Sequence, residues 1–400
     1  MRKKVLVLGS NFGGLTAALS VKKELDGDVD VTVLSDRDYF LYNPSLIWLP
    51  FGKRDGKDIT FKVAPTFAAH GVDFVQKAAA KIEPDLNQVI DVDGGVHSYD
   101  YLIIATGTKN DWDRVPGLYD NAGTIVTLQD AERSAEQWKK FLDDPGDIVI
   151  GATQGASCFG AAYEYLFNVS YQLKKAGIKK RVKMTYVTAE PYLGHFGIDG
   201  MPTGKFMVNM FMKKENIDSI TNASMEYVSK DSVKLTDGRE LPYKYAMIVP
   251  PFLGVDAVRS NEKLANPAGF VPVRDTYQTT SYDNVYAVGL AAAVQVPWTT
   301  PVPVGVPKTG FPTETQAHAA AANIAEQIRG GRPSHEKPFG EIPAVCVMDA
   351  GNNGIMLLGD HMLKPRKAAV LIPGPQNHAI KLGLEKYFLW KSQKGLVQLP

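Results

Sequence analysis

Residues 5–20 read VLVLGSNFGGLTAALS, and this stretch decides the fold. Its first four residues are valines and leucines, as in a strand that is buried on both faces of a parallel sheet. A glycine-rich turn follows at residues 9–14, and residues 15–24 then carry small and apolar side chains at helical spacing. The stretch therefore predicts a strand, a tight turn and a helix, the first unit of an α/β fold.

The turn GSNFGG at residues 9–14 is a variant of the G-x-G-x-x-G fingerprint, in which backbone amides and a helix N-terminus hold a pyrophosphate. Asn11 replaces the second glycine, and asparagine tolerates a positive φ better than most side chains do. A ribose-binding acid is expected about twenty residues further on. Ser35 and Asp36 follow the next strand there, and we favour Asp36 as the ribose ligand. A solvated loop acid is the alternative.

Three more apolar runs end at glycine: YLIIATG at 101–107, DIVIG at 147–151 and VYAVG at 285–289. The first and third form the pair of signatures typical of flavoprotein reductases with two dinucleotide domains, and the second restarts the strand and helix pattern. We therefore expect a first dinucleotide domain at 1–145, a second Rossmann-like domain at 146–268, a return to the first domain at 269–332, and a C-terminal domain at 333–400.

The composition limits the partners of the chain. Lys and Arg number 44 against 43 for Asp and Glu, so no overall electrostatic field favours binding of nucleic acid.

The basic N-terminus leads into an apolar run of about four residues, whereas the apolar core of a signal peptide needs ~7–15. No run of ~18 apolar residues predicts a spanning helix. The two cysteines are too few for a secreted disulfide scaffold, and a homo-oligomer is left open.

The segment 376–394 has a helical pattern that is rich in aromatic residues and lysines. Ile380 and Leu384 share one side with Tyr387 and Phe388, and Trp390 lies close by. The lysines expected to surround them are Lys381, Lys386, Lys391 and Lys394. Such a helix suits the membrane interface, where it lies in the plane of the surface. A helix docked on the core of the protein is the alternative. The aromatic candidates for contact with the membrane or with a quinone are Tyr387, Phe388 and Trp390.

Motifs along the whole chain resemble those of the sulfide:quinone oxidoreductase family. They are DYF at 38–40, PS at 44–45 with Trp48, GATQGASCFG at 151–160, EPYLGH at 190–195, IVPPF at 248–252, PVPVGVPKTG at 301–310, AVCVMD at 344–349 and EKYFLWK at 385–391. The resemblance implies two Rossmann-like dinucleotide-binding domains with a C-terminal membrane-interface helical tail. It also implies a peripheral protein of a prokaryotic-type cytoplasmic membrane that oxidises sulfide to polysulfide or sulfur and reduces quinone.

The resemblance further implies a non-covalent FAD in the first domain. Lys308 would stabilise the reduced flavin from its N1–C2 edge. The residues expected to bind the cofactor are Gly9, Asn11, Phe12, Gly13, Gly14, Ser35, Asp36, Ala78, Ala105, Thr106, Gly107, Gly289, Lys308, Thr309 and Gly310.

Catalysis is expected to depend on Cys158 and Cys346, which the resemblance pairs in a disulfide or polysulfide bridge over the flavin. Hydrosulfide would open the bridge, Cys158 would carry the sulfur, and Cys346 would attack flavin C4a. Cys158 stands at a predicted helix start, which favours its thiolate. His195 is the candidate for proton transfer, with a structural role as its alternative.

Two departures and three alternatives qualify the resemblance. Many family members have a third cysteine within 108–146, where this chain has none, and Leu290 replaces a frequent acid. A type II NADH:quinone dehydrogenase would need an intact glycine fingerprint at 151–155. The flavin subunit of a flavocytochrome c sulfide dehydrogenase usually has a cysteine that tethers FAD. A non-catalytic flavin-binding persulfide carrier or sensor is the third alternative.

Overall fold

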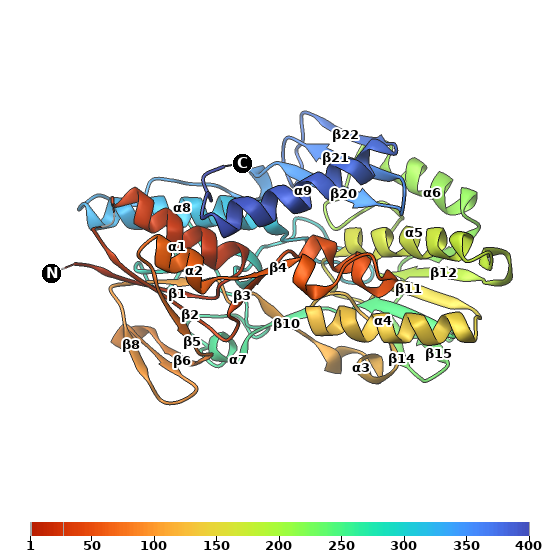
Figure 1. Cartoon of the computed structure of the whole chain (residues 1–400), viewed down its shortest axis with the longest axis horizontal. Helices are drawn as coiled ribbons and strands as arrows, with labels where there is room; N and C mark the ends of the chain where they lie inside the picture. Colours follow the sequence, from red (N-terminus) through yellow and green to blue (C-terminus); the bar gives the residue numbers. More distant parts are fainter. Residues whose placement is uncertain (1, 27, 400) are drawn as a thin grey trace.

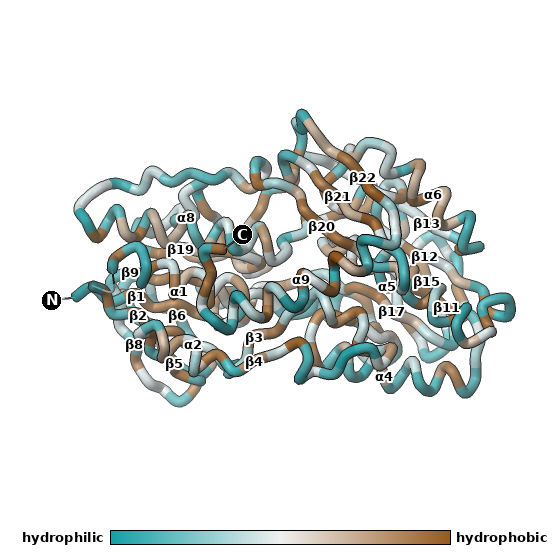
Figure 2. The backbone as a smooth tube through the Cα atoms, turned by 45° about the horizontal axis from the view of Figure 1, so that its top comes forward, coloured by the Kyte–Doolittle hydropathy of each residue, from teal (hydrophilic) through white to brown (hydrophobic). Residues whose placement is uncertain are grey.

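The computed structural model describes residues 2–26 and 28–399. Two α/β halves lie side by side along the long axis of the molecule, with the N-terminus at the outer end of one half (Figure 1). The C-terminal helix α9, Gln376–Gln393, runs across both halves. In Figure 2 the strands of the two main sheets are mainly hydrophobic in colour, and many outer loops are hydrophilic.

The first half is built on a parallel sheet with the order β19-β9-β1-β2-β5. Its central strand β1 is the run predicted at 5–8, and these side chains are at most 3% exposed. The late strand β19 pairs with β9 in this sheet, so the chain returns to the first half after the second has been built. The strands are β1 (Lys4–Leu8), β2 (Asp30–Ser35), β5 (Asp73–Gln76), β9 (Tyr101–Ile104) and β19 (Val285–Ala287).

Helices α1, Phe12–Glu24, and α8, Gly310–Ile328, pack against each other beside this sheet. Small residues make the close approach possible, because they put little side-chain bulk between the two backbones. The fully buried alanines are Ala17 and Ala18 on α1, and Ala317, Ala320, Ala321 and Ala325 on α8.

The second half contains a parallel sheet with the order β13-β12-β11-β17. All residues of three of its four strands, β11, β12 and β17, are buried, as expected for a sheet covered on both faces. Helix α5 packs on β11 and β17, and α4 also packs on β17. The elements are β11 (Ile148–Ala152), β12 (Met184–Thr188), β13 (Ile217–Ile220), β17 (Tyr245–Val249), α4 (Leu128–Asp143), α5 (Phe159–Lys175) and α6 (Gly204–Lys214).

A three-stranded antiparallel sheet follows α8 and covers the second half. Its strands are β20 (Ala344–Asp349), β21 (Gly354–Gly359) and β22 (Ala369–Pro373). Strand β20 lies between α5 and α9 and contacts both. This arrangement carries the late segment around Cys346 back to the start of α5, as the family resemblance implied.

Shorter elements complete the chain. The remaining helices are α2 (Ala64–Ala69), α3 (Leu118–Asn121), α7 (Asp256–Arg259) and the 3-10 turns η1 (Asn43–Phe51), η2 (Gly56–Asp58), η3 (Pro84–Leu86), η4 (Trp112–Arg114), η5 (Lys179–Arg181), η6 (Gly289–Ala291) and η7 (Phe339–Glu341). The remaining strands are β3 (Tyr39–Leu41), β4 (Thr60–Lys62), β6 (Ala79–Glu83), β7 (Gln88–Asp91), β8 (Val96–Ser98), β10 (Thr108–Asn110), β14 (Met225–Val228), β15 (Ser232–Leu235), β16 (Glu240–Pro242) and β18 (Phe252–Gly254).

The predicted α/β fold is confirmed, and the expected strands and helices occur within a few residues of their predicted bounds. The prediction for α9 was wrong in one respect. Lys381 and Lys391 do not flank an exposed apolar stripe but are buried at 2% and 0% exposure, because acids on α5 and α8 pair with them. Among the described helices, none is both long and apolar enough to cross a bilayer.

Candidate active site

The turn after β1 can exist only with glycine at two positions. Gly9 has φ +105°, and a Cβ there would lie 2.4 Å from the carbonyl oxygen of Ala105. A Cβ on Gly14 would lie 1.8 Å from the carbonyl oxygen of Gly9. Any side chain at either position would therefore displace backbone, so this sequence keeps a narrow turn beside the end of β9.

The predicted conformation of Asn11 was wrong. Asn11 has φ −92° and ψ −158°, which is extended backbone and needs no tolerance of positive φ. Its side chain instead links neighbouring loops, because Asn11 Oδ1 accepts from the backbone N–H of Leu41 at 3.0 Å and its amide donates to Asn43 at 3.0 Å. The asparagine thus fixes the turn against the segment that follows β2.

The N-termini of α1 and α8 share a feature that suits an anion. Neither Asn11 before α1 nor Thr309 before α8 caps its helix with a side chain, and no acid lies in either first turn. The first amides of a helix have no partners within the helix and carry a partial positive charge. Gly310 lies against the ring of Phe12, with 2.9 Å between its built Cβ position and Phe12 Cε1, so the two helix starts are neighbours.

The two candidate ribose ligands differ in their surroundings. Ser35 is 5% exposed, and its hydroxyl bonds to Ser10 Oγ at 3.0 Å and accepts from the backbone of Arg37. Asp36 is exposed at the end of β2. Ser35 therefore holds the loop, and Asp36 has the carboxylate that is accessible to a ligand.

The other predicted cofactor residues line the ends of the same sheet. Ala105 and Thr106 follow β9 and are half-buried, and Ala78 is half-buried after β5. Gly107 has φ +68°, and a Cβ there would meet no atom within 4 Å, so open space adjoins it. Gly289 begins η6 next to α8, where its N–H donates to Gln316 Oε1 at 2.5 Å.

Lys308 is held by backbone carbonyls rather than by an acid. Its Nζ donates to Leu290 O at 2.9 Å and to Ala292 O at 2.6 Å, and it lies 4.5 Å from the ring centroid of Phe270. Desolvation lowers the pKa of Lys308 to about 7. An anion bound beside this ammonium would favour its charged form.

The loop 301–310 connects this turn with the segment that carries Cys158. Gly155 N–H donates to Pro303 O at 2.7 Å, and Gly305 N–H donates to Ala156 O at 2.9 Å. The same loop continues into Lys308 and the start of α8. Motifs about 150 residues apart in the chain are thereby fixed side by side through backbone hydrogen bonds.

The structure brings the two cysteines to facing elements. Cys158 is the N-cap of α5, and Cys346 lies on β20, which packs against α5. Both are free and partly buried. The thiolate form of Cys158 would add to the causes that raise the pKa of Cys346, so the two side chains lie within electrostatic range of each other.

The expected thiolate at Cys158 was wrong for this state of the protein. Desolvation raises the pKa of Cys158 and outweighs the hydrogen bond from the Ala161 backbone at the start of the helix. Desolvation and the nearby Glu164 carboxylate raise the pKa of Cys346 to about 12. Both groups are therefore neutral thiols at neutral pH, and the position of Cys158 at a helix start does not overcome its burial.

A buried ion pair lies next to both thiols, and sequence reasoning did not find it. Lys381 on α9 donates to Glu164 on α5, and each side chain influences the pKa values of Cys158 and Cys346. Desolvation raises the pKa of Glu164 to about 7. The only local signal in the sequence was Glu164, the single charged residue in the otherwise apolar and aromatic helix stretch AAYEYLF at 161–167.

Asp349 connects β20 with the start of α9. Its carboxylate accepts from Trp48 Nε1 at 2.8 Å and contacts His378 Nδ1 at 2.6 Å, and its backbone N–H donates to Glu164 at 2.7 Å. These contacts fix the strand that carries Cys346. The motifs around Trp48 and Asp349, which carried the family resemblance, meet here.

His195 is buried at 2% exposure, and desolvation lowers its pKa. Its Nδ1 accepts from the backbone N–H of Gly197 at 3.2 Å, so the neutral ring carries its proton on Nε2, which lies 3.9 Å from Asp199 Oδ1. The ring centroid lies 5.0 Å from that of Trp298. His195 is thus a neutral imidazole in a packed environment.

The aromatic residues of α9 lie near the predicted cofactor turn. The ring centroid of Phe388 is 6.2 Å from that of Phe12 and 5.7 Å from that of Tyr42. Tyr387 is half-buried, and Trp390 is 48% exposed. The inner side of α9 therefore touches the glycine turn, while Trp390 faces outward.

Comparisons with known proteins agree with this geometry. Residues 3–321 match the family described as pyridine nucleotide-disulphide oxidoreductase. The sulfide-quinone reductase of Aquifex aeolicus is 37% identical over 99% of this chain and 92% of its own length. The X-ray structure of the sulfide:quinone oxidoreductase from that bacterium has a TM-score of 0.94 at 36% identity, covering 98% of this chain and 92% of that chain. A type II NADH:quinone oxidoreductase of Staphylococcus aureus is 22% identical over 92% of this chain and 93% of its own length.

The fold, the glycine turn and the family match define an oxidoreductase of the pyridine nucleotide-disulphide class. Within that class, the chain belongs to the sulfide:quinone oxidoreductases, because its similarity to the Aquifex aeolicus protein extends over nearly the whole length of both chains.

Proposed function

We propose that the enzyme oxidises sulfide at Cys158 and Cys346 and passes two electrons through FAD to a membrane quinone. The observation that carries the proposal is the placement of the two cysteines on α5 and β20, which face each other. No other cysteine exists in the sequence, so thiol chemistry has to use this pair.

Hydrosulfide would enter as the nucleophile when Cys158 and Cys346 are bridged, because a bridged pair has no thiolate of its own; in the reduced pair both thiols are neutral. When the pair is bridged, attack on one sulfur gives a persulfide on one cysteine and a thiolate on the other. Attack of that thiolate on the persulfide would rebuild a bridge that is longer by one sulfur, with the loss of one proton from the persulfide and of two electrons, which FAD would accept. Glu164 lies close enough to influence both thiols and can accept that proton, because its pKa is about 7.

The residues of the first half fit a non-covalent FAD. The first amides of α1 and α8, which no side chain caps, suit its pyrophosphate, and the exposed Asp36 suits a ribose. When bound, FAD would accept electrons from the cysteine pair and deliver them to the quinone. Lys308 would supply positive charge beside it, and its low pKa makes it able to release a proton.

We further propose the domain division expected from the sequence, with cofactor binding in 1–145 and 269–332 and the cysteines supplied by 146–268 and 333–400.

Phe388 contacts Phe12, so a quinone between the cofactor turn and α9 would lie within reach of both. Trp390 and Lys386 are exposed on α9, Lys394 is exposed directly after it, and all three would face the membrane surface. His195 stays a candidate proton carrier in its neutral form.

Anaerobic bleaching of the flavin tests this function. Sulfide should reduce the FAD of the purified enzyme rapidly, and a short-chain quinone should reoxidise it, whereas NADH should reduce it slowly. Acid precipitation should release the flavin into the supernatant, since both cysteines are assigned to sulfur chemistry. Rapid bleaching by NADH with none by sulfide would refute the proposal.

A further inference from the structure

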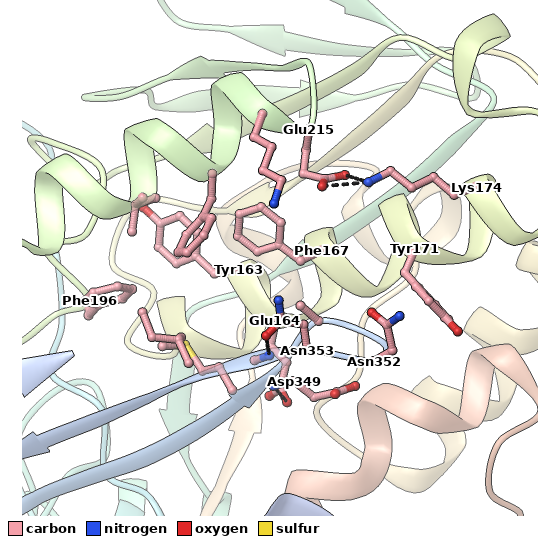
Figure 3. Close-up of a pocket in the computed structure, with 17 residues that line it drawn as sticks. Tyr163, Glu164, Phe167, Tyr171, Lys174, Phe196, Glu215, Asp349, Asn352 and Asn353 are labelled. Carbon is pink, nitrogen blue, oxygen red and sulfur yellow. Dashed lines mark hydrogen bonds and ion pairs between the residues drawn. The ribbon is translucent and has the colours of Figure 1, made fainter. Parts of the chain in front are cut away.

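We propose that the cavity between α5, α6 and the β20–β21 hairpin binds the anionic polysulfide product as it leaves the cysteine pair. The inference rests on the proposed function and extends it to the product. The cavity has a volume of about 250 Å³, and Figure 3 shows the side chains that line it.

The wall of the cavity is apolar and rich in aromatic rings. The lining rings and aliphatic or thioether groups belong to Tyr163, Phe167, Phe196, Phe211, Met348 and Ile355. The hydroxyl of Tyr163 is already engaged, since it donates to Glu190 at 2.8 Å and accepts from Gly194. The ring of Tyr163 therefore offers an apolar surface, and sulfur makes favourable contacts with such aromatic groups.

The inner end of the cavity adjoins the cysteines. Met348 lines the cavity and lies two residues after Cys346 on β20, so both side chains point to the same face of the sheet. A Cβ built on Gly160, two residues after Cys158, would lie 3.7 Å from Met348 Sδ. Glu164 lines the cavity and also influences both thiols. Met348 and Glu164 thus lie between the cavity and the two cysteines.

The outer end offers positive charge. Lys174 and Lys214 line the cavity, and Lys174 pairs with Glu215 at 2.6 Å. Among the described residues, none forms a salt bridge with Lys214. Of the carboxylates at the floor, Glu164 is paired with Lys381, and Asp349 accepts a hydrogen bond from Trp48 and contacts His378. The exposed ammonium of Lys214 is therefore open to an anion at this end, while the lining carboxylates are engaged by other side chains.

The sequence gives a reason for such a site. With only two cysteines, no third thiol can take over the growing sulfur chain. The chain must therefore leave the pair as a free species, and a polysulfide anion has apolar, polarisable sulfur atoms together with terminal charge. A cavity with an aromatic wall and a lysine at its mouth matches both properties.

Filling the cavity tests its role. Ile355 lines the cavity, and the next residue, Met356, points to the opposite face of the sheet, so Ile355→Trp and Met356→Trp form a matched pair. In Ile355→Trp, sulfide should bleach the flavin once at the wild-type rate. Steady-state sulfide oxidation with a short-chain quinone should fall about tenfold, the effect of a barrier raised by ~1.4 kcal/mol. Met356→Trp should match the wild type.

Equal steady-state rates for the two tryptophan variants would overturn the inference while leaving the proposed function intact. Slower first bleaching in Ile355→Trp would also overturn it, since the cavity would then be the sulfide entrance. A wild-type enzyme that sulfide does not bleach would remove the proposed function together with the inference.

A charge reversal tests the mouth without burying a new side chain. Lys214 lines the cavity, whereas its exposed neighbour Lys213 does not, so Lys214→Glu is compared with Lys213→Glu. Sodium tetrasulfide should inhibit the wild type and Lys213→Glu alike, and Lys214→Glu should need about fivefold more for the same inhibition, as expected for ~1 kcal/mol. Identical inhibition of both variants would contradict a polysulfide site here.

Discussion

Lys381 on α9 donates a hydrogen bond to Glu164 on α5, and both side chains are buried although 217 residues separate them. Lys381→Met should therefore destabilise the protein by about 3–5 kcal/mol, because it leaves an uncompensated buried carboxylate. Urea unfolding would measure this loss. Lys386→Met on the exposed side of α9 is the control and should cost at most about 1 kcal/mol.

The double variant Lys381→Met with Glu164→Gln separates charge from packing. Since no charge is then buried without a partner, it should recover much of the stability lost in Lys381→Met. A double variant as unstable as the single one would show that the ion pair itself does not account for the loss.

Lys308 predicts a pH dependence of apoprotein stability. Its folded pKa of about 7 lies below the ordinary value of 10.5, so the folded state disfavours the charged form. The free energy of unfolding of the apoprotein is therefore not reduced by Lys308 above pH 10.5, where this side chain is neutral in both states. It decreases as the pH falls toward 7, because the unfolded chain then binds a proton that folded Lys308 does not. Lys308→Met should remove this dependence and raise the melting temperature of the apoprotein at neutral pH. A wild-type pH profile in the variant would contradict the lowered pKa.

The limits of sequence reasoning follow from the distance between partners. The unit from β1 to α1 was predictable because its apolar period and glycines are local. The burial of Lys381 and Lys391 could not be predicted, because their partners lie 217 and 77 residues away in the sequence. The neutral state of Cys158 was missed for the same reason, since its helix position is local but its desolvation comes from the tertiary fold.

The glycine turn predicts a specific loss of cofactor. Gly14→Ala should reduce the FAD retained after purification to a small fraction of the wild-type amount, because the new Cβ would overlap Gly9 O. Flavin absorbance per protein measures this. Gly383→Ala on α9 is the control, since a Cβ there meets no atom within 4 Å. It should keep FAD and add about 0.5–1 kcal/mol of stability.

Exposed Trp390 predicts a contribution to membrane binding that can be tested without removing α9. Truncation of this helix would leave Glu164 and Glu314 without their lysines, so a single substitution is the better probe. Trp390→Ser should weaken binding to anionic vesicles about tenfold, as for the loss of roughly 1.5 kcal/mol of apolar burial. Leu86→Ser, at another exposed apolar position, is the control. Equal vesicle sedimentation of both variants would refute the contact.

The two cysteines carry the prediction on which the function depends. Cys346→Ser should abolish reduction of the flavin by sulfide, because no thiolate remains at β20 to pass electrons on, while FAD binding and the oxidised spectrum persist. Cys158→Ser should block turnover as well, since hydrosulfide then has no bridge to open. Direct reaction of hydrosulfide with the flavin is the competing route, and it needs neither cysteine.

Stopped-flow bleaching under anaerobic sulfide decides between these routes. Each variant should lose at least about a thousandfold in rate, comparable to losing an essential catalytic group. Acid-released flavin measured in parallel would show that the cofactor is still bound before the reaction starts. Because Cys158 and Cys346 are the only cysteines, no other thiol in the chain can replace either one. Wild-type bleaching rates in both serine variants would therefore establish the direct route and refute the cysteine mechanism.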